Sequence, residues 1–330
     1  MKKILILTAD KTGSGHKSSS NAISKQLTDR GFEVRQIDVF TLMGRFGRFL
    51  EESYIPATTR TPWFFFILER TSQYFPDIIH TMMYHHVARN MEKQIRDYDP
   101  DLIITAAYGQ FIPSAVLDYP RFGCINAHGS LLPKYRGGAP IQRAIINGEN
   151  ETGVSIMYMV KKMDAGDILM SRSIPIMIDD TNTTMFSKLS DLSLEMLQDL
   201  LPKLFSGDVE TRKQNEEEAT FAYNLEKEIE HIRFDEEVKT VYDHIRGLLD
   251  EPGAYFVCKG KKYKMEKVFF EKAEDSRPST FIGLEKDYLR IDCIDGFIKV
   301  YQIRPEGKNS MDARSFHNGN GRNMKGETLE

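Results

Sequence analysis

The chain has 330 residues and a formal net charge of −4. That length exceeds one ordinary hydrophobic core and predicts two domains, or three. The near-neutral charge excludes a global attraction to nucleic acid, so any RNA contact must come from a local basic surface. The 3 cysteines have no paired metal-site spacing, which favours a reducing cytoplasm over a disulfide framework.

No stretch of the sequence is apolar for long enough to cross a bilayer. The most hydrophobic window, residues 63–68, is far shorter than the ~20 residues that a spanning helix needs. The apolar run at the start, residues 4–7, is soon followed by charged residues and predicts a first strand rather than a signal peptide. We therefore expect a soluble, cytoplasmic protein.

The first sixty residues begin with a predicted strand, a glycine loop and a helix. The apolar run 4–9 is followed by the loop 10–16, and a helical pattern continues to Gly31. Such a loop can bind a phosphate or polar headgroup at the helix start, or can be an empty turn. A dinucleotide fingerprint would need glycine where Ser18 stands, but Asp38 lies at the ribose-binding distance, so a nicotinamide site stays open.

Residues 41–98 are rich in aromatic residues and methionine. Arg45 and Arg48 alternate with phenylalanines there, which fits peripheral contact with a lipid surface. Helical packing, with the aromatic residues in the core, explains the same composition. The histidines of this segment do not form a His-Glu-x-x-His pattern, and no metal site is predicted.

An amide and an imidazole stand two residues apart near the middle of the chain. Asn126 lies in a predicted strand at 123–127 and His128 continues the same extended segment, so their side chains point to one side. Asp164 lies in a glycine-containing loop after the apolar run 154–160. An imidazole base, a carboxylate that orients it and an amide that binds an oxyanion suit acyl transfer to an amine. An isolated Asn-x-His pair also occurs as ordinary hydrogen-bonded structure.

A longer string of motifs distinguishes these alternatives. It consists of Asn126-x-His128, Ser130-Leu131-Leu132-Pro133, Tyr135 to Pro140, Glu151 to Val154, and Asp164 to Asp167. Gln214 to Tyr223, Ile245-Arg246-Gly247 and Arg304 to Lys308 continue it. With these motifs, residues 106 to about 317 resemble the folate-dependent formyltransferases, and most closely those that act on methionyl-tRNA.

The resemblance implies transfer of a formyl group from 10-formyltetrahydrofolate to the amino group of methionyl-tRNA, without a metal. It assigns His128 as the base, Asp164 as the residue that sets its orientation and charge, and Asn126 as the oxyanion donor. The cofactor-binding residues that it implies are Tyr108, Gln110, Ser130, Leu131, Leu132 and Pro133.

Residues 1–104 resemble a different family. Thr8-Ala9-Asp10, the run Gly13 to Ser18 and the strand Val34 to Asp38 are similar to the N-terminal domain of monogalactosyldiacylglycerol synthase-type glycosyltransferases. Residues 8–17 also lack the Gly-Thr-Pro-Phe-like loop by which formyltransferases cradle folate. Two alternatives follow: a sugar-nucleotide formyltransferase, and a hybrid chain with a lipid glycosyltransferase-like first half and impaired folate and tRNA binding.

The predicted fold is an α/β, Rossmann-like doubly wound parallel sheet followed by a small OB-like β-barrel. The strands at 123–127 and 154–160 are expected to form a βαβ unit, and Thr181 to cap a long helix with a kink at Pro202. Lysines around the turn at Gly260 fit either an RNA contact or a solvated hairpin. The predicted domains are 1–206 (1–104 atypical, 105–206 formyltransferase core), the linker 207–222, the OB-like domain 223–317 and a flexible tail 318–330.

Overall fold

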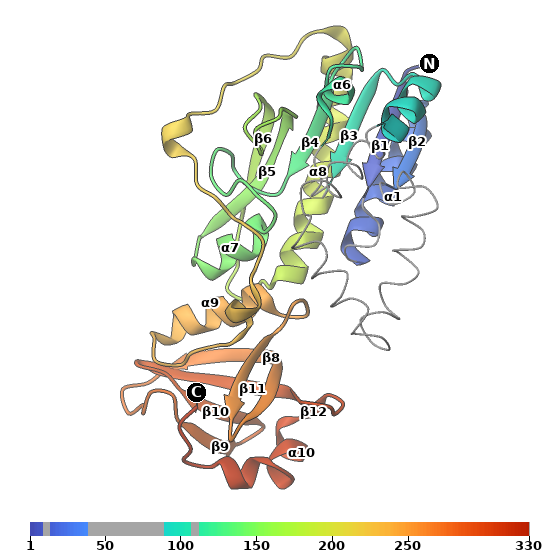
Figure 1. Cartoon of the computed structure of the whole chain (residues 1–330). Helices are drawn as coiled ribbons and strands as arrows, with labels where there is room; N and C mark the ends of the chain where they lie inside the picture. The colour runs from blue at the N-terminus through green and yellow to red at the C-terminus, as the bar shows by residue number, and fades with distance from the viewer. Residues whose placement is uncertain (9–13, 39–88, 107–111, 330) are drawn as a thin grey trace, which may run out of the picture. The chain divides into compact units, whose positions relative to one another are not determined.

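The computed structural model of the chain describes residues 1–8, 14–38, 89–106 and 112–329 (Figure 1). The predicted glycine loop at 10–13 and residues 41–88 of the aromatic-rich segment lie outside these residues. Residues 89–98 are helical. The remaining elements are β1 (Lys3–Thr8), α1 (Ser14–Asp29), β2 (Glu33–Asp38), β3 (Leu102–Ala106), α6 (Ser114–Leu117), β4 (Cys124–His128), α7 (Pro140–Ile146), β5 (Glu151–Tyr158), β6 (Ile168–Pro175), α8 (Asn182–Ser206), η1 (Glu216–Glu218), η2 (Lys227–Glu230), α9 (Val238–Leu248), β7 (Ala254–Cys258), β8 (Lys261–Lys272), β9 (Phe281–Glu285), β10 (Tyr288–Asp292), β11 (Gly296–Pro305), β12 (Met311–Asp312), α10 (Ala313–Asn318) and η3 (Gly321–Met324).

The first sheet has the strand order β2-β1-β3-β4-β5-β6 (Figure 1). β1 pairs in parallel with β2 and β3, and β3 pairs in parallel with β4. The run Ile4 to Leu7 in β1 is fully buried, as the inner strand of a parallel sheet covered on both faces must be. The predicted α/β, Rossmann-like fold is confirmed.

One predicted feature of this sheet is wrong. β5 runs antiparallel to β4, with Asn126 opposite Met157 and His128 opposite Ser155. A parallel return needs a crossover of about a dozen residues or more. α7 has 7 residues and is therefore only ~10 Å long at 1.5 Å per residue. The helix does not carry the chain back along the sheet, so β5 starts at the edge where β4 ends.

The start of α8 confirms the predicted cap. The Thr184 amide donates to Thr181 Oγ1 at 3.3 Å, and the Thr181 amide donates to Thr184 Oγ1 at 2.9 Å. This reciprocal pair satisfies amides that the first turn of a helix leaves open. Pro202 lies inside the helix, near its end.

The second sheet is antiparallel, with the order β7-β8-β11-β10-β9, and β12 pairs with β11 (Figure 1). Side chains alternate between buried and less buried along β7, as expected for a sheet with one face on a core. That core includes Phe234, Phe256, Phe281 and Phe316. The small C-terminal β domain of the prediction is confirmed.

The structure differs from the flexible tail predicted at 318–330. Residues Gly321–Met324 form η3, and Thr328 makes a β-bridge with Thr280. Met324 and Leu329 are 2% and 6% exposed and belong to the C-terminal core. The burial of these two apolar side chains and the bridge to Thr280 together hold this segment on the core.

The chain divides into two compact units whose segments alternate along the sequence. The first comprises Met1–His128, Ser155–Ser171 and Leu192–Asn215, and the second comprises Gly129–Val154, Arg172–Asp191 and Glu216–Glu330. The division departs from the predicted boundary at residue 206 because α7 packs against α9 within the second unit. A Cβ at Gly247 of α9 would lie 2.7 Å from Ile146 Cγ1, so this close packing requires a glycine.

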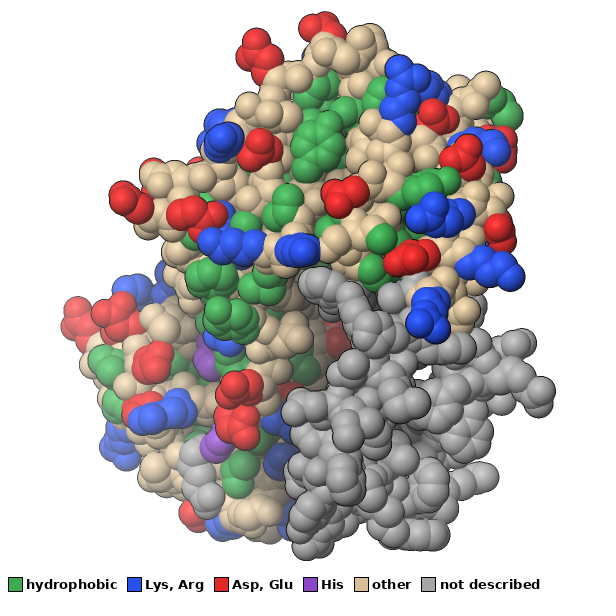
Figure 2. Space-filling model, turned by 45° about the horizontal axis from the view of Figure 1, so that its top comes forward, with side chains coloured by type: hydrophobic (Ala, Val, Ile, Leu, Met, Phe, Trp, Pro, Cys, Tyr) green, Lys and Arg blue, Asp and Glu red, His purple; other side chains and the backbone are tan. Residues whose placement is uncertain are grey.

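The distribution of charges and the state of the thiols agree with the near-neutral net charge and the cysteine spacing of the sequence. Figure 2 shows one face on which the Lys, Arg, Asp and Glu side chains are interspersed rather than gathered by sign. Among the described residues, no helix combines the length and the apolar character that a bilayer crossing requires. Cys124, Cys258 and Cys293 are buried thiols that form no disulfide. Burial is the main cause that raises the pKa of Cys124 to about 12.

Candidate active site

Asn126 and His128 lie on β4, between β3 and β5 in the first sheet. Because they are two residues apart on one strand, their side chains lie on the same face. His128 is 6% exposed, and Asn126 is half-buried. Neighbouring strands extend this face, since Thr105 is the register partner of Asn126 on β3 and Met157 its partner on β5.

The structure brings Asp164 to His128. Asp164 Oδ2 lies 3.8 Å from His128 Nδ1, and the two side chains are 17% and 7% exposed. This separation exceeds a hydrogen bond but is within the range of an ion pair once the imidazole is protonated. With Nδ1 turned to the carboxylate, Nε2 is the nitrogen that can accept a proton from a substrate.

The loop between β5 and β6 holds Asp164 in a constrained backbone. Asp164 has a φ of +47°, a left-handed conformation that is uncommon for residues other than glycine. A Cβ at Gly166 would lie 1.7 Å from the Tyr158 carbonyl oxygen, so only glycine fits there. The Tyr158 amide in turn donates to the Asp167 carbonyl at 3.0 Å. Strained positions of this kind gather at functional sites.

Thr105 orients Asn126, and sequence reasoning did not identify it. Its hydroxyl is fully buried and lies 2.9 Å from Asn126 Oδ1, to which it can donate. Ile125 O at 3.3 Å and Met159 Sδ at 3.1 Å also lie near this hydroxyl. With Oδ1 occupied by a donor, the Nδ2 end of the amide is the part of Asn126 that can donate to a substrate oxyanion.

The predicted cofactor-binding residues fall into two groups. Tyr108 and Gln110 lie outside the described residues. Ser130 to Pro133 belong to the second compact unit, where the Ser130 hydroxyl donates to the Lys134 carbonyl at 2.7 Å and closes the loop. Ser130 and Leu132 are 1% and 3% exposed. Their predicted role towards folate stays a prediction.

The linker after α8 pairs with the segment that follows this loop. Arg136 is fully buried, and its Nη1 and Nη2 each donate to a carboxylate oxygen of Glu216 at 3.1 Å. Its amide donates to Thr220 O at 2.9 Å, and the Ala222 amide donates to Arg136 O at 2.7 Å. A Cβ at Gly137 would lie 2.6 Å from Ala222 O. Residues 216–222 of the linker are therefore an ordered part of the second unit, whereas residues 207–215 belong to the first.

Several lysines of the predicted RNA-binding hairpin have partners within the protein. Lys264 Nζ donates to Pro252 O at 2.9 Å, and Lys259 Nζ donates to Asn323 O at 2.7 Å. Lys262 Nζ lies 4.3 Å from the centre of the Tyr255 ring. These contacts favour the structural interpretation of this basic cluster over a row of phosphate contacts.

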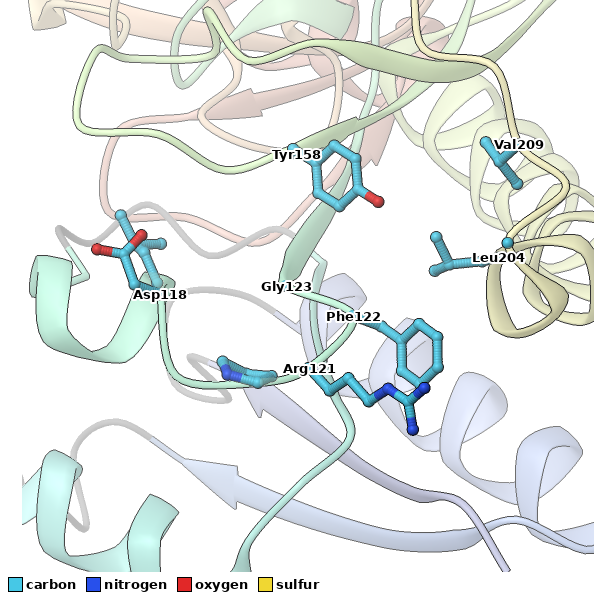
Figure 3. Close-up of a pocket in the computed structure, with 10 residues that line it drawn as sticks. Asp118, Arg121, Phe122, Gly123, Tyr158, Leu204 and Val209 are labelled. Carbon is cyan, nitrogen blue, oxygen red and sulfur yellow. The ribbon is translucent and has the colours of Figure 1, made fainter.

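A cavity of about 530 Å³ lies elsewhere in the first unit (Figure 3). Gly123, which precedes β4, and Tyr158, at the end of β5, line it together with Phe122 and Leu204. Burial raises the pKa of the Tyr158 hydroxyl. His128 stands at the opposite end of β4, ~16 Å away for five residues of strand. This cavity is not the space in front of the imidazole.

Among the described residues, no group of three or more His, Cys, Asp or Glu side chains is arranged to hold a metal ion.

The Rossmann-like sheet and the grouping of Asn126, His128 and Asp164 are of the kind expected for α/β enzymes that transfer a small acyl group. The comparisons identify the family. The model of the formyl transferase family matches residues 12–201, and that of the formyl transferase C-terminal domain matches residues 224–321. The chain belongs to the formyl transferase family.

A relative of known name supports this assignment, and solved structures show a similar fold. Methionyl-tRNA formyltransferase of Macrococcus caseolyticus (strain JCSC5402) is 47% identical over 225 residues, which cover 68% of this chain and 72% of the relative. The fold is similar to HypX from Aquifex aeolicus in complex with tetrahydrofolic acid, with a TM-score of 0.65 and 18% identity. That match covers 95% of this chain and 46% of HypX, so the chain spans about half of that protein's length. WlaRD, a sugar 3N-formyl transferase in the presence of dTDP and 5-N-formyl-THF, has a TM-score of 0.60 at 16% identity, with 94% and 99% covered.

Proposed function

We propose that this protein transfers the formyl group of 10-formyltetrahydrofolate to the amino group of methionyl-tRNA. The observation that carries the proposal is the approach of Asp164 Oδ2 to within 3.8 Å of His128 Nδ1, because His128 lies on the sheet face that also presents Asn126. The identity of 47% with a protein named methionyl-tRNA formyltransferase supports this acceptor.

Asn126, His128 and Asp164 together suit the transfer of a formyl group from the N10 amine of the folate to a second amine, that of methionyl-tRNA. The methionyl amine attacks the formyl carbon, and His128 Nε2 accepts the proton that the amine loses. Asn126 Nδ2 donates to the oxyanion of the tetrahedral intermediate, while Asp164 holds the imidazolium. The C–N bond to folate N10 then breaks, and the proton on His128 returns to that nitrogen, which gives formyl-methionyl-tRNA and tetrahydrofolate.

The test is formyl transfer by the purified protein with 10-formyltetrahydrofolate and methionyl-tRNA. We expect His128→Ala to lower kcat about 10²- to 10⁴-fold, because it removes the general base. Asp164→Asn, which keeps the shape of the side chain and removes its charge, is expected to lower kcat as well. Full activity in both variants would refute the proposed roles.

The acceptor is the second point to test, because the fold is also similar to the sugar 3N-formyl transferase WlaRD. Under the proposal, an amino-sugar nucleotide is not formylated at a rate comparable to methionyl-tRNA. The reverse preference would make the protein a sugar-nucleotide formyltransferase. A methionyl-tRNA acceptor also places the reaction in the cytoplasm, where translation occurs.

The resemblance of residues 1–104 to lipid glycosyltransferases stays a prediction. The formyl transferase match begins at residue 12 and includes most of the same segment, which supports one formyltransferase domain over a hybrid. The predicted lipid contact lies largely at 41–88, outside the described residues. Binding of a folate analogue by the purified protein tests the hybrid alternative, since impaired folate binding is what that alternative requires.

A further inference from the structure

The linker residue Gln214 contacts the loop that carries Asp164. Gln214 Nε2 donates to the Asp164 carbonyl oxygen at 2.8 Å and to the Gly166 carbonyl oxygen at 2.7 Å. An amide nitrogen carries two hydrogens, and these two bonds use both. One side chain thus fixes the backbone on both sides of Ala165.

The backbone before Gln214 is itself fixed. Ile168, the first residue of β6, and Arg212 exchange two hydrogen bonds, Ile168 N to Arg212 O at 2.8 Å and the reverse at 2.9 Å. Gln214 follows two residues later and is half-buried. Its Nε2 also lies 3.9 Å from the sulfur of Met157, the register partner of Asn126. The side chain therefore lies close to the face that presents Asn126 and His128.

The loop needs such support. The left-handed conformation of Asp164 persists only where surrounding contacts fix it. Within the loop, the Ala165 amide makes a long hydrogen bond of 3.3 Å to Lys162 O, and Met163 is 43% exposed. The contacts of Gln214 are shorter, and one of them acts on the backbone carbonyl of Asp164 itself. They reach across 50 residues of sequence.

We propose that Gln214 is a positioning residue for Asp164, so that the interdomain linker completes the active site. The inference rests on the proposed function, because it gives Asp164 a part in the reaction. A misplacement of about 1 Å at a reacting group can lower the rate about 100-fold. The loss of a loop contact can displace Asp164 by a distance of this order.

Two variants test the contact. Gln214→Met keeps the length of the side chain and removes both donors, and Gln214→Glu places a carboxylate against two carbonyl oxygens. We expect kcat to fall about 10- to 100-fold in both, with KM for each substrate within about 2-fold of the wild type. Gln198→Glu is the matched control: Gln198 is also half-buried, but it bonds to Gln26 and Arg30 in the first unit. Its kcat is expected to stay unchanged.

A double-mutant cycle separates positioning from general stability. If Gln214 acts through Asp164, Gln214→Met causes no further loss of kcat in an Asp164→Ala background. An equal loss in both backgrounds would overturn the proposal, and so would a wild-type kcat in Gln214→Met and Gln214→Glu. If Asp164→Ala itself keeps full activity, the proposed role of Asp164 in the reaction fails rather than the contact.

Amide hydrogen exchange then tests the contact without a measurement of activity. We expect faster exchange at residues 162–167 in Gln214→Met, with unchanged exchange in β4. Unchanged exchange at 162–167 would overturn the inference, whatever the catalytic result.

Discussion

At the scale of single residues, the orientation of one amide decides whether Asn126 can assist the reaction. An amide presents an oxygen on one side and a nitrogen on the other, and only the nitrogen can donate to an oxyanion. The buried hydroxyl of Thr105, 2.9 Å from Asn126 Oδ1, favours the useful orientation. The oxygen is then bound within the protein, and the nitrogen is left for the substrate.

Thr105→Val replaces this hydroxyl by a methyl group of similar size. We expect kcat to fall about 10-fold, less than the 10²- to 10³-fold that follows complete removal of an oxyanion donor. Thr105→Ser keeps the hydroxyl and should restore most of the rate. Initial rates at saturating substrate give kcat for both variants. Equal losses of kcat in Thr105→Val and Thr105→Ser would argue against a role for the hydroxyl.

Sequence reasoning identified Asn126, His128 and Asp164 but not Thr105 or Gln214. The first three have side chains whose types and spacing suit the chemistry. Thr105 and Gln214 matter only through contacts with partners 21 and 50 residues away. Those contacts depend on strand register and on the path of the linker, which composition and local periodicity do not contain.

At the scale of elements, the start of α8 depends on a buried carboxylate. Asp180 accepts hydrogen bonds from the Met177 amide at 2.8 Å, from the Thr184 hydroxyl at 2.9 Å and from Lys188 Nζ at 2.7 Å. Burial acts to raise the pKa of Asp180, but the hydrogen bonds from Lys188, Met177 and Thr184 outweigh it and lower the pKa below its usual value of 3.8. The carboxylate therefore stabilises the folded state in its charged form.

The sign of the pH dependence follows from this lowered pKa. The stabilisation by Asp180 is complete above its unfolded pKa of about 3.8 and is lost as the pH falls through its lower folded pKa. At pH ~7, Asp180→Asn is expected to reduce the free energy of unfolding by about 1–3 kcal/mol. The difference in the free energy of unfolding between Asp180→Asn and the wild type should become smaller as the pH falls. Urea titrations across pH measure it, with Asp191→Asn, an exposed carboxylate of the same helix, as the control.

The elements show where periodicity is informative and where it is not. Apolar runs predicted β1, β3 and β4, and Thr181 predicted the start of α8. The direction of β5 did not follow, because strand direction depends on how far the intervening chain travels, and the local pattern is the same for both directions. Met324 and Leu329 likewise show no period, so their burial depends on a core built by distant strands.

At the scale of the whole molecule, the linker is an ordered element, and a buried cation fixes it. Arg136 and Glu216 form a bidentate pair 80 residues apart in sequence. The planar fork of an arginine matches both oxygens of a carboxylate, whereas a lysine offers a single charged nitrogen. The pair thus specifies where the chain lies after α8.

Arg136→Lys keeps the charge and removes the fork. We expect a loss of about 1–3 kcal/mol in the free energy of unfolding, because a lysine at this buried position cannot make both hydrogen bonds to Glu216. Limited proteolysis should also cleave residues 216–222 sooner. Arg143→Lys, on the half-buried face of α7, is the comparison variant and should change neither measurement. Wild-type stability in Arg136→Lys would mean that the fork contributes nothing to linker order.

The buried thiols have a practical consequence. Cys124 belongs to the first compact unit, and Cys258 and Cys293 belong to the second. A buried thiol does not react with an alkylating reagent until the surrounding structure opens. The native cysteines therefore report separately on the opening of each unit, and mass spectrometry of alkylated peptides can follow both in one sample without any introduced label.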